Sequence, residues 1–292
     1  MNRVKGILWA ALSSSTFGLA PLFTLLLIGV GYSSFEVLTY RWGVASLCLG
    51  AYGLMAGCNF RLGRRELGTV FLLSIFRAAT SLSLVIAYQN IASGMASTIH
   101  FMYPLVVALV MMCFFRERGS VWTFAAIALS IVGAVLLSQG NAGFTRGDTT
   151  LGIVSSVVSV VAYGGYIVGV RKSRAVEIDS TVLTCYVMAF GALFFIIGGC
   201  FTGGIRLETD PHTRLCILGI ALPATALSNM ALVQAIKSIG PTLTSIFGAM
   251  EPVTAVVIGV CVFAEPFTVQ GAGGILLIVA AVTMVVLRSR RP

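Results

Sequence analysis

The sequence predicts an all-α membrane protein with ten transmembrane helices, arranged as two inverted repeats of five helices each. Three observations predict this fold: long apolar runs, an alternation of basic loops, and an internal repeat. Of the 292 residues, 58% are hydrophobic and 10% are charged, whereas a soluble domain is about 25% charged. So little charge cannot cover a soluble globule of this length.

Apolar runs of about 20 residues, the length that crosses a bilayer, divide the chain into ten predicted spans. They cover residues 5–30, 35–57, 67–89, 95–115, 119–138, 150–170, 180–202, 213–235, 241–263 and 268–288. The basic N-terminus resembles a signal peptide, but the apolar run after it is too long, so we expect an uncleaved first span. The glycine-rich linker 140–149 is expected to join a first repeat, 1–139, to a second, 150–292.

Lysine and arginine are abundant in every second loop. Fourteen of the 19 lie on one side of the predicted membrane and three on the other, while Arg41 and Arg77 lie inside spans. Because cytoplasmic loops are rich in Lys and Arg, this bias predicts a multi-pass inner-membrane protein with both termini in the cytoplasm. Topology and contact with anionic lipid headgroups then account for the net charge of +9, and we expect no nucleic-acid partner.

The internal repeat appears at a shift of 148 residues, where eleven identical pairs fall within about forty positions of the two halves. Among them, Pro104 falls on Pro252 and Glu117 falls on Glu265. Each repeat holds five spans, an odd number, so the second copy enters the membrane from the opposite face. Inverted repeats of this kind are typical of secondary transporters, whose substrate site lies near the midplane between the halves.

The segments 103–118 and 251–266 each carry a proline near the start and a glutamate thirteen residues after it. They resemble the signature of the drug/metabolite transporter (DMT) superfamily, EamA type, with Ala264 where that family usually has glycine. The resemblance covers essentially the whole chain. It implies export or exchange of small metabolites such as amino acids, and related branches carry nucleotide sugars or phosphorylated sugars.

Two arginines inside spans are the first candidates for substrate binding, because intramembrane charges usually face a substrate path or a partner. Arg77, near mid-membrane, and Arg41 are predicted to hold a substrate carboxylate or phosphate through the planar fork of the guanidinium. Neither falls on an arginine in the other repeat, as expected of residues that add specificity to a symmetric scaffold. The alternatives are snorkelling to the interface or an ion pair with Glu36 or Glu251.

Four further residues are candidates for coupling or gating. His100 titrates near neutral pH and Glu251 lies deep in the ninth span, so either is a candidate proton site. The alternatives are a histidine bonded to a backbone carbonyl and a carboxylate bonded to N–H groups freed near Pro252. Pro104 and Pro252 interrupt the fourth and ninth spans, and the resulting kinks are either hinges for alternating access or static bends.

Neutral polar side chains are the remaining candidates for the substrate site. Tyr163, followed by two glycines, and Asn229 are predicted to bind substrate, with hydrogen bonds between helices as the alternative. His100 is a further candidate ligand. Phe17, Trp42 and Phe101 either stack on an aromatic cargo or pack the core.

The leading hypothesis is a proton- or gradient-coupled exporter of amino acids or similar metabolites that works by alternating access. The alternatives are an exporter of organic cations or drugs, which needs an acidic site, and a sugar-phosphate or nucleotide-sugar-like carrier. An enzyme is not expected, because the sequence lacks H-E-x-x-H, G-x-S-x-G and Walker motifs. Seven cysteines form no C-x-x-C pair, so neither a metal nor another cofactor is expected. The lipid bilayer and a small molecule are the expected partners, and a monomer suffices although a dimer stays open.

Overall fold

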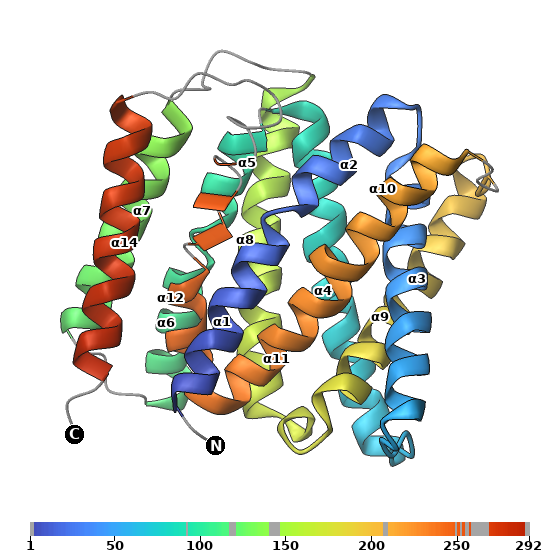
Figure 1. Cartoon of the computed structure of the whole chain (residues 1–292), viewed down its shortest axis with the longest axis horizontal. Coiled ribbons are helices and arrows are strands. Elements are labelled where there is room, and N and C mark those ends of the chain that lie inside the picture. Colours follow the sequence, from blue (N-terminus) through green and yellow to red (C-terminus); the bar gives the residue numbers. More distant parts are fainter. Residues whose placement is uncertain are drawn as a thin grey trace.

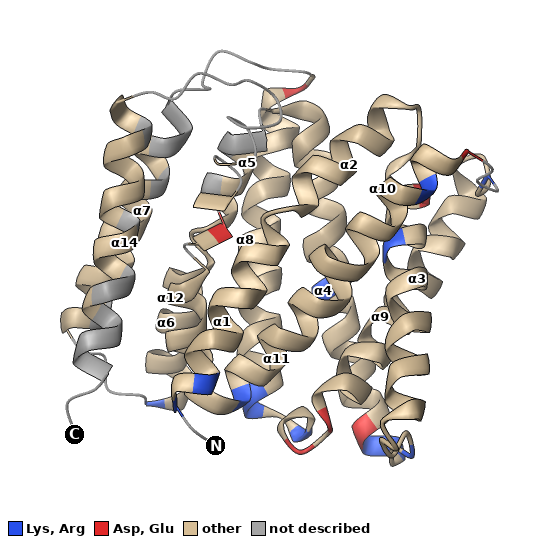
Figure 2. Ribbon diagram, in the orientation of Figure 1, with Lys and Arg blue, Asp and Glu red and all other residues tan. Residues whose placement is uncertain are grey.

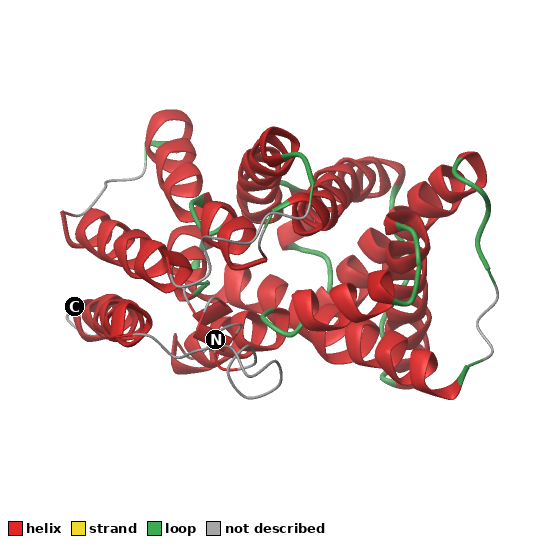
Figure 3. Ribbon diagram, turned by 90° about the horizontal axis from the view of Figure 1, so that it is seen from above, coloured by secondary structure: helices red, strands yellow, loops and turns green. Residues whose placement is uncertain are grey.

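The computed structural model describes residues 3–91, 93–116, 121–139, 147–206, 210–248, 250–251, 253–254, 257 and 269–289. Within these ranges the regular elements are helices, which run side by side through the molecule (Figure 3). The predicted all-α class is therefore confirmed.

The first half begins with a span made of two pieces. Its helices are α1 (Arg3–Phe17) and α2 (Ala20–Gly29), then α3 (Ser34–Met55), α4 (Arg64–Asn90), the pair α5 (Ser93–His100) and α6 (Tyr103–Phe115), and α7 (Val121–Gln139). The second half holds α8 (Thr149–Lys172), the short turn η1 (Arg174–Val176) and α9 (Ser180–Phe201). The next span is continuous but irregular, with α10 (Pro211–Ala221), the π-helical turn η2 (Leu222–Leu227) and α11 (Ser228–Ile239). The described helices of the last two spans are α12 (Pro241–Phe247) and α14 (Val269–Ser289), and residues 250–251, 253–254 and 257 of the ninth span are helical as well.

Five stretches in the described chain are long and apolar enough to cross a membrane, judged by length and composition. They are Arg3–Gly29, Arg64–Asn90, Thr149–Lys172, Ser180–Phe201 and Pro211–Ile239. The start of α1 and the end of α14 lie at the same end of the molecule (Figure 1), as ten spans require. Many of the Lys and Arg residues lie at that end (Figure 2), which we call the basic end.

Helix packing follows the symmetry that two inverted repeats demand. The most extensive contacts join α7 to α14, α3 to α9, α4 to α8, and α1 to α11. Exchanging the two repeats maps the first two pairs onto themselves and maps α4 with α8 onto α11 with α1. The ten-helix, five-plus-five fold is therefore confirmed by its packing.

Closely packed glycines repeat the same symmetry at atomic detail. A Cβ added to Gly6 of α1 would lie 2.5 Å from Ile239 Cγ2, and one added to Gly152 of α8 would lie 2.6 Å from Ile91 Cγ2. Ile239 follows Ile91 by the 148-residue shift. Small residues let membrane helices approach closely, and each half uses one at the same place.

Capping side chains fix where several helices begin. Asp148, Asp179 and Asp210 each accept hydrogen bonds from backbone N–H groups in the first turn of α8, α9 and α10. Ser33 and Glu36 form a capping box at the start of α3, so the N–H groups there are satisfied without water.

Glu36 also forms an ion pair, and its partner is not the one that we considered. Its Oε1 accepts a hydrogen bond from Arg206 Nε at 2.9 Å, in the connection between α9 and α10. This bond raises the pKa of Arg206, which lies over the ring of Tyr32. Glu36 sits in the first turn of α3, where that connection arrives, whereas the Arg41 side chain bonds elsewhere.

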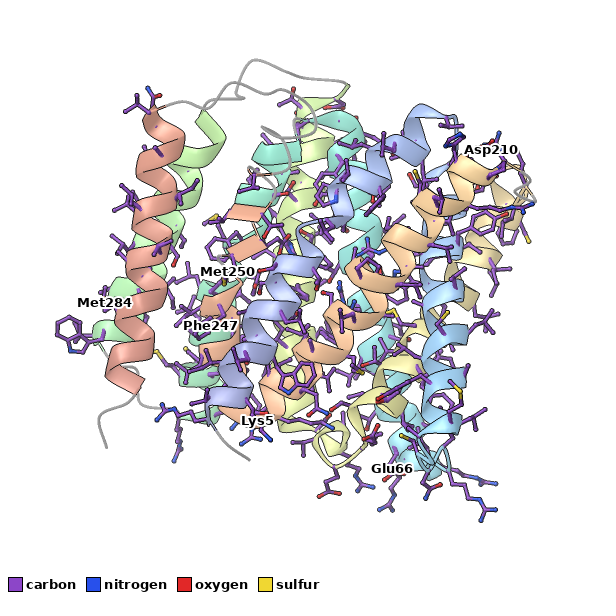
Figure 4. All side chains as sticks on the ribbon, viewed as in Figure 1. Lys5, Glu66, Asp210, Phe247, Met250 and Met284 are labelled. Atoms are coloured by element: carbon purple, nitrogen blue, oxygen red, sulfur yellow. The ribbon has the colours of Figure 1, made fainter. Side chains whose placement is uncertain are left out.

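Three spans of the described chain are irregular in their interior. The first breaks between Phe17 and Ala20, the fourth breaks between His100 and Tyr103, and the eighth contains the π-helical turn η2. Pro21 and Pro104 occupy the first turn of the helix after each break, where a missing N–H costs nothing. Figure 4 places Phe247 and Met250 of the ninth span about midway between Lys5 at the basic end and Asp210 at the other end.

The symmetric glycine contacts predict matched losses of stability. Gly6→Val and Gly152→Val should each lower the free energy of unfolding by about 1–3 kcal/mol, because the added atoms overlap an isoleucine in the neighbouring helix. Gly68→Val on α4 is the control, since no heavy atom lies within 4 Å of its added Cβ. Thermal unfolding in detergent measures the difference, and equal melting temperatures for all three variants would contradict the packing.

Candidate functional site

Two arginines lie in the interior of the protein, Arg77 at the middle of α4 and Arg41 two turns after the start of α3. Arg77 in α4 is 1% exposed and Arg41 in α3 is 4% exposed. Both remain among apolar helices rather than snorkelling to an interface. A guanidinium buried in this way needs hydrogen-bond acceptors or a counter-ion, because it has left the water that solvated it.

Each arginine is held at its Nε by the irregular eighth span. Arg41 Nε donates to Thr225 Oγ1 at 2.6 Å, and Arg77 Nε donates to Asn229 Oδ1 at 2.8 Å. Thr225 and Asn229 are one helical turn apart, and Thr225 belongs to the π-helical turn η2. The two arginines come from the first repeat and their acceptors come from the second.

The acceptors are themselves oriented by the backbone of the eighth span. Thr225 Oγ1 donates to the carbonyl of Ile220 at 2.7 Å, which leaves its lone pairs for Arg41. Asn229 Nδ2 donates to the carbonyl of Thr225 at 2.8 Å, which turns its Oδ1 towards Arg77. The donor and acceptor capacities of both side chains therefore match what they contact.

One outer nitrogen of each guanidinium is left without a partner among the described residues. Arg41 Nη2 and Arg77 Nη1 are buried and make no hydrogen bond. Neither arginine lies within 4.0 Å of a carboxylate in the part of the chain that the structure describes, where the ion pair is Glu36–Arg206. Buried charges are ordinarily paired, so two unpaired guanidiniums together are an unusual arrangement.

Aromatic rings surround the arginines. The Phe17 ring centroid lies 5.6 Å from Arg41 Cζ and 5.2 Å from Arg77 Cζ. Arg77 Cζ also lies 5.0 Å from the centroid of Tyr163 and 5.9 Å from that of Tyr166. Cation–π attraction offsets part of the cost of burying these charges without replacing a counter-ion.

His100 belongs to the same aromatic group, at the point where the fourth span breaks. Its ring centroid lies 5.1 Å from that of Tyr163 and 5.4 Å from that of Tyr103. Nδ1 is 2.8 Å from the Ser159 hydroxyl on α8, and Nε2 has no partner. The backbone carbonyl considered as its alternative partner is replaced by this serine hydroxyl.

Glu251 is the acidic side chain of the ninth span that the structure describes, and it is 4% exposed. Its Oε1 makes no hydrogen bond, and the carboxyl interacts electrostatically with Arg77 and Arg41 without forming an ion pair. Gly18, at the break in the first span, packs against its backbone: a Cβ there would lie 2.9 Å from the Glu251 carbonyl oxygen. Glu251 and the two arginines thus occupy one electrostatic environment.

The structure brings together all five predicted substrate ligands, His100 among them, and of the other coupling or gating candidates it places Glu251 and Pro104. We call the set of Arg41, Arg77, Phe17, Tyr163, Thr225, Asn229, His100 and Glu251 the central site. Pro104 lies in the first turn of α6, directly after the break that follows His100. Pro252 lies outside the described residues, as do Glu117 and Glu265.

Sequence reasoning missed Thr225 and undervalued Phe17. Thr225 is a neutral residue in an apolar run, and nothing in its neighbours marks it as the acceptor for an arginine from the other repeat. Its one sequence signal is that it falls on Arg77 at the 148-residue shift. Phe17 packs in the core, as one of its two expected roles has it, and it also lies against both guanidiniums.

Comparison with known proteins agrees with this architecture. A family model described as the EamA-like transporter family matches residues 4–139 and 150–287. An uncharacterized transporter of Archaeoglobus fulgidus is 24% identical over 279 residues, which cover 94% of this chain and 96% of that protein. An uncharacterized transporter of Synechocystis is also 24% identical over 204 residues, and that match covers 69% of this chain but only 61% of the relative.

The fold also has a solved counterpart. One crystal structure superposes with a TM-score of 0.85 and covers 99% of this chain and 98% of its own, at 15% sequence identity. At this identity the likeness concerns the fold alone.

Because Arg41 Nε donates to Thr225, we predict that replacing Thr225 lowers stability more than replacing Thr24, another buried threonine. Thr225→Val should lower the free energy of unfolding by about 1–3 kcal/mol, because Arg41 Nε then loses its acceptor in a buried place. Thr24→Val is the matched control, since Thr24 Oγ1 is buried and already lacks a partner. Thermal unfolding of the two variants in the same detergent measures this. A loss for Thr24→Val equal to that for Thr225→Val would contradict the assignment.

Proposed function

Because the chain belongs to the EamA-like transporter family, we propose that it is a secondary transporter that exports small carboxylate-bearing metabolites, such as amino acids. The cargo binds at the central site, near the middle of the membrane, and the two repeats rock about it in alternating access. The observation that carries this proposal is the pair of buried guanidiniums without a counter-ion.

A substrate carboxylate supplies what the central site lacks. Arg41 Nη2 and Arg77 Nη1 each offer a free donor, and both are fixed by their Nε bonds before any cargo arrives. Pre-positioned donors in a dry environment bind an anion strongly, because little ordering remains to be done when it binds. Tyr163, Asn229 and His100 complete the site as neutral hydrogen-bonding groups.

Glu251 and the span irregularities support a coupled, alternating-access mechanism. Glu251 shares the electrostatic field of both arginines, which makes it the proposed site for an exchanged proton. The breaks at Phe17 and at His100 allow half-helices to tilt separately, and Pro104 and Pro252 are the proposed hinges. The gathering of basic side chains at one end supports cytoplasmic termini in the inner membrane.

Two other cargo classes remain as outcomes of the test. An organic cation needs an acidic site, whereas the described central site holds two arginines and one glutamate. A sugar phosphate or nucleotide sugar would use the same guanidiniums through a phosphate instead of a carboxylate. The arginines favour a cargo with an anionic group, whether that group is a carboxylate or a phosphate.

Efflux from proteoliposomes tests this proposal. The purified protein should release labelled carboxylate-bearing metabolites, and Arg77→Gln should slow release by on the order of tenfold to a hundredfold. That range follows from the loss of a charge-assisted hydrogen bond of about 1.5–3 kcal/mol. Arg64→Gln is the control, because Arg64 is an exposed arginine at the start of the same helix.

Melting temperatures separate a binding role from a structural one. Arg77→Gln removes a buried charge that lacks a counter-ion, so the variant should melt no lower than the native protein. Release of quaternary amines alone, or an Arg77→Gln rate equal to that of Arg64→Gln, would contradict the carboxylate site.

A further inference from the structure

Charge in the central site is unbalanced, and the imbalance bears on the cargo's own charge. Resting on the proposed function, we propose that the cargo is a net anion, an organic acid whose carboxylate is not cancelled by an ammonium group of its own. A neutral zwitterion and a cation are then poor cargoes, so the amino acids in the proposed function narrow to those with a net negative charge.

Counting the buried acidic, basic and histidine side chains gives the imbalance. The described chain buries Glu36, Arg41, Arg77, His100 and Glu251. Glu36 forms an ion pair with Arg206 near the end opposite Lys5. His100 lies beside aromatic rings, and its Nδ1 is hydrogen-bonded to the Ser159 hydroxyl. The centre therefore holds two guanidiniums, which keep their charge in proteins, against one carboxyl group.

An uncompensated charge inside a membrane is costly, so occupancy is favoured when the occupant completes the balance. With Glu251 ionised, a monoanion neutralises the centre. With Glu251 protonated, a dianion does so. A zwitterion adds no net charge and leaves the imbalance as it was.

Contacts of the arginines also weigh against an ammonium group. Aromatic faces are the usual neutral binders of ammonium groups, but Phe17, Tyr163 and Tyr166 already lie against Arg77, and Phe17 lies against Arg41 as well. An ammonium entering this group meets two like charges. Among the unpartnered atoms of the central site, Arg41 Nη2 and Arg77 Nη1 are charged donors that the oxygens of an anion can satisfy, and the unpartnered acceptor, Glu251 Oε1, interacts electrostatically with the same two arginines.

Four short probes of matched length isolate net charge from size. Succinate carries two carboxylates, butanoate carries one, 4-aminobutanoate carries one carboxylate and one ammonium, and putrescine carries two ammonium groups. Each is added at millimolar concentration to the purified full-length protein, and the shift in melting temperature reports binding. Succinate and butanoate should bind on the order of tenfold more tightly than 4-aminobutanoate, and putrescine should not bind.

Variants tie the preference to the residues named. Arg77→Gln and Arg41→Gln should each abolish the difference between succinate and 4-aminobutanoate. Glu251→Gln removes the acid and increases the excess positive charge, so succinate binding should persist or tighten. Arg64→Gln should leave all four responses unchanged.

Each outcome decides the proposal. The proposal is overturned if 4-aminobutanoate or putrescine raises the melting temperature more than succinate does. It is also overturned if neither succinate nor butanoate raises the melting temperature. Succinate binding without flux in proteoliposomes overturns the proposed transport function and leaves the charge preference standing. Arg77-dependent flux of 4-aminobutanoate in preference to both anions supports the proposed transport function and overturns the charge preference.

Discussion

The central site depends on two hydrogen bonds between the repeats, Arg41 Nε to Thr225 and Arg77 Nε to Asn229. Each bond takes one donor of a guanidinium and orients the rest of it. Because the acceptors lie on one span and the arginines lie on two others, the bonds also fix how the halves meet at mid-depth. A membrane interior offers no water to replace them, so the guanidiniums have few other places to point.

The symmetric scaffold explains where the irregular features lie. Spans 3 and 6, which are α4 and α8, are continuous helices that pack together. Their counterparts are span 8 with the π-helical turn η2 and span 1 with its break at Phe17, and these two also pack together. The pair α4 and α8 is therefore regular and the symmetry-related pair, spans 8 and 1, is interrupted, although both repeats have the same fold.

Side chains follow the same division. Arg77 falls on Thr225 at the 148-residue shift, and Ser81 falls on Asn229. Arg77, on the regular helix α4, donates to Asn229 on the interrupted span, and Thr225 on that span accepts from Arg41 of α3. In the proposed mechanism, a charge held by the continuous helix is retained or released by the interrupted span, which couples cargo binding to movement of the halves.

The fold was predictable because a membrane constrains it strongly. Span length, basic loops and an odd-numbered repeat depend only on the order of residue types along the chain, so they are visible in one sequence. Arg41, Arg77 and Asn229 could be selected singly because polar groups inside spans are conspicuous. Their grouping was not predictable, since it depends on a π-helical turn that sets the direction of Thr225 and on the break that brings Phe17 to both arginines. Glu36 was a candidate partner for Arg41, but it lies in the first turn of α3 and accepts a hydrogen bond from Arg206 instead.

The most direct test of the central claim is a structure of the full chain with bromosuccinate bound, with the bromine located by its anomalous scattering. The account predicts a bromine peak beside Phe17, with carboxylate oxygens about 2.7–2.9 Å from Arg41 Nη2 and Arg77 Nη1 while both Nε bonds persist. A bromine peak away from these residues, with Glu251 paired to the arginines instead, would contradict it.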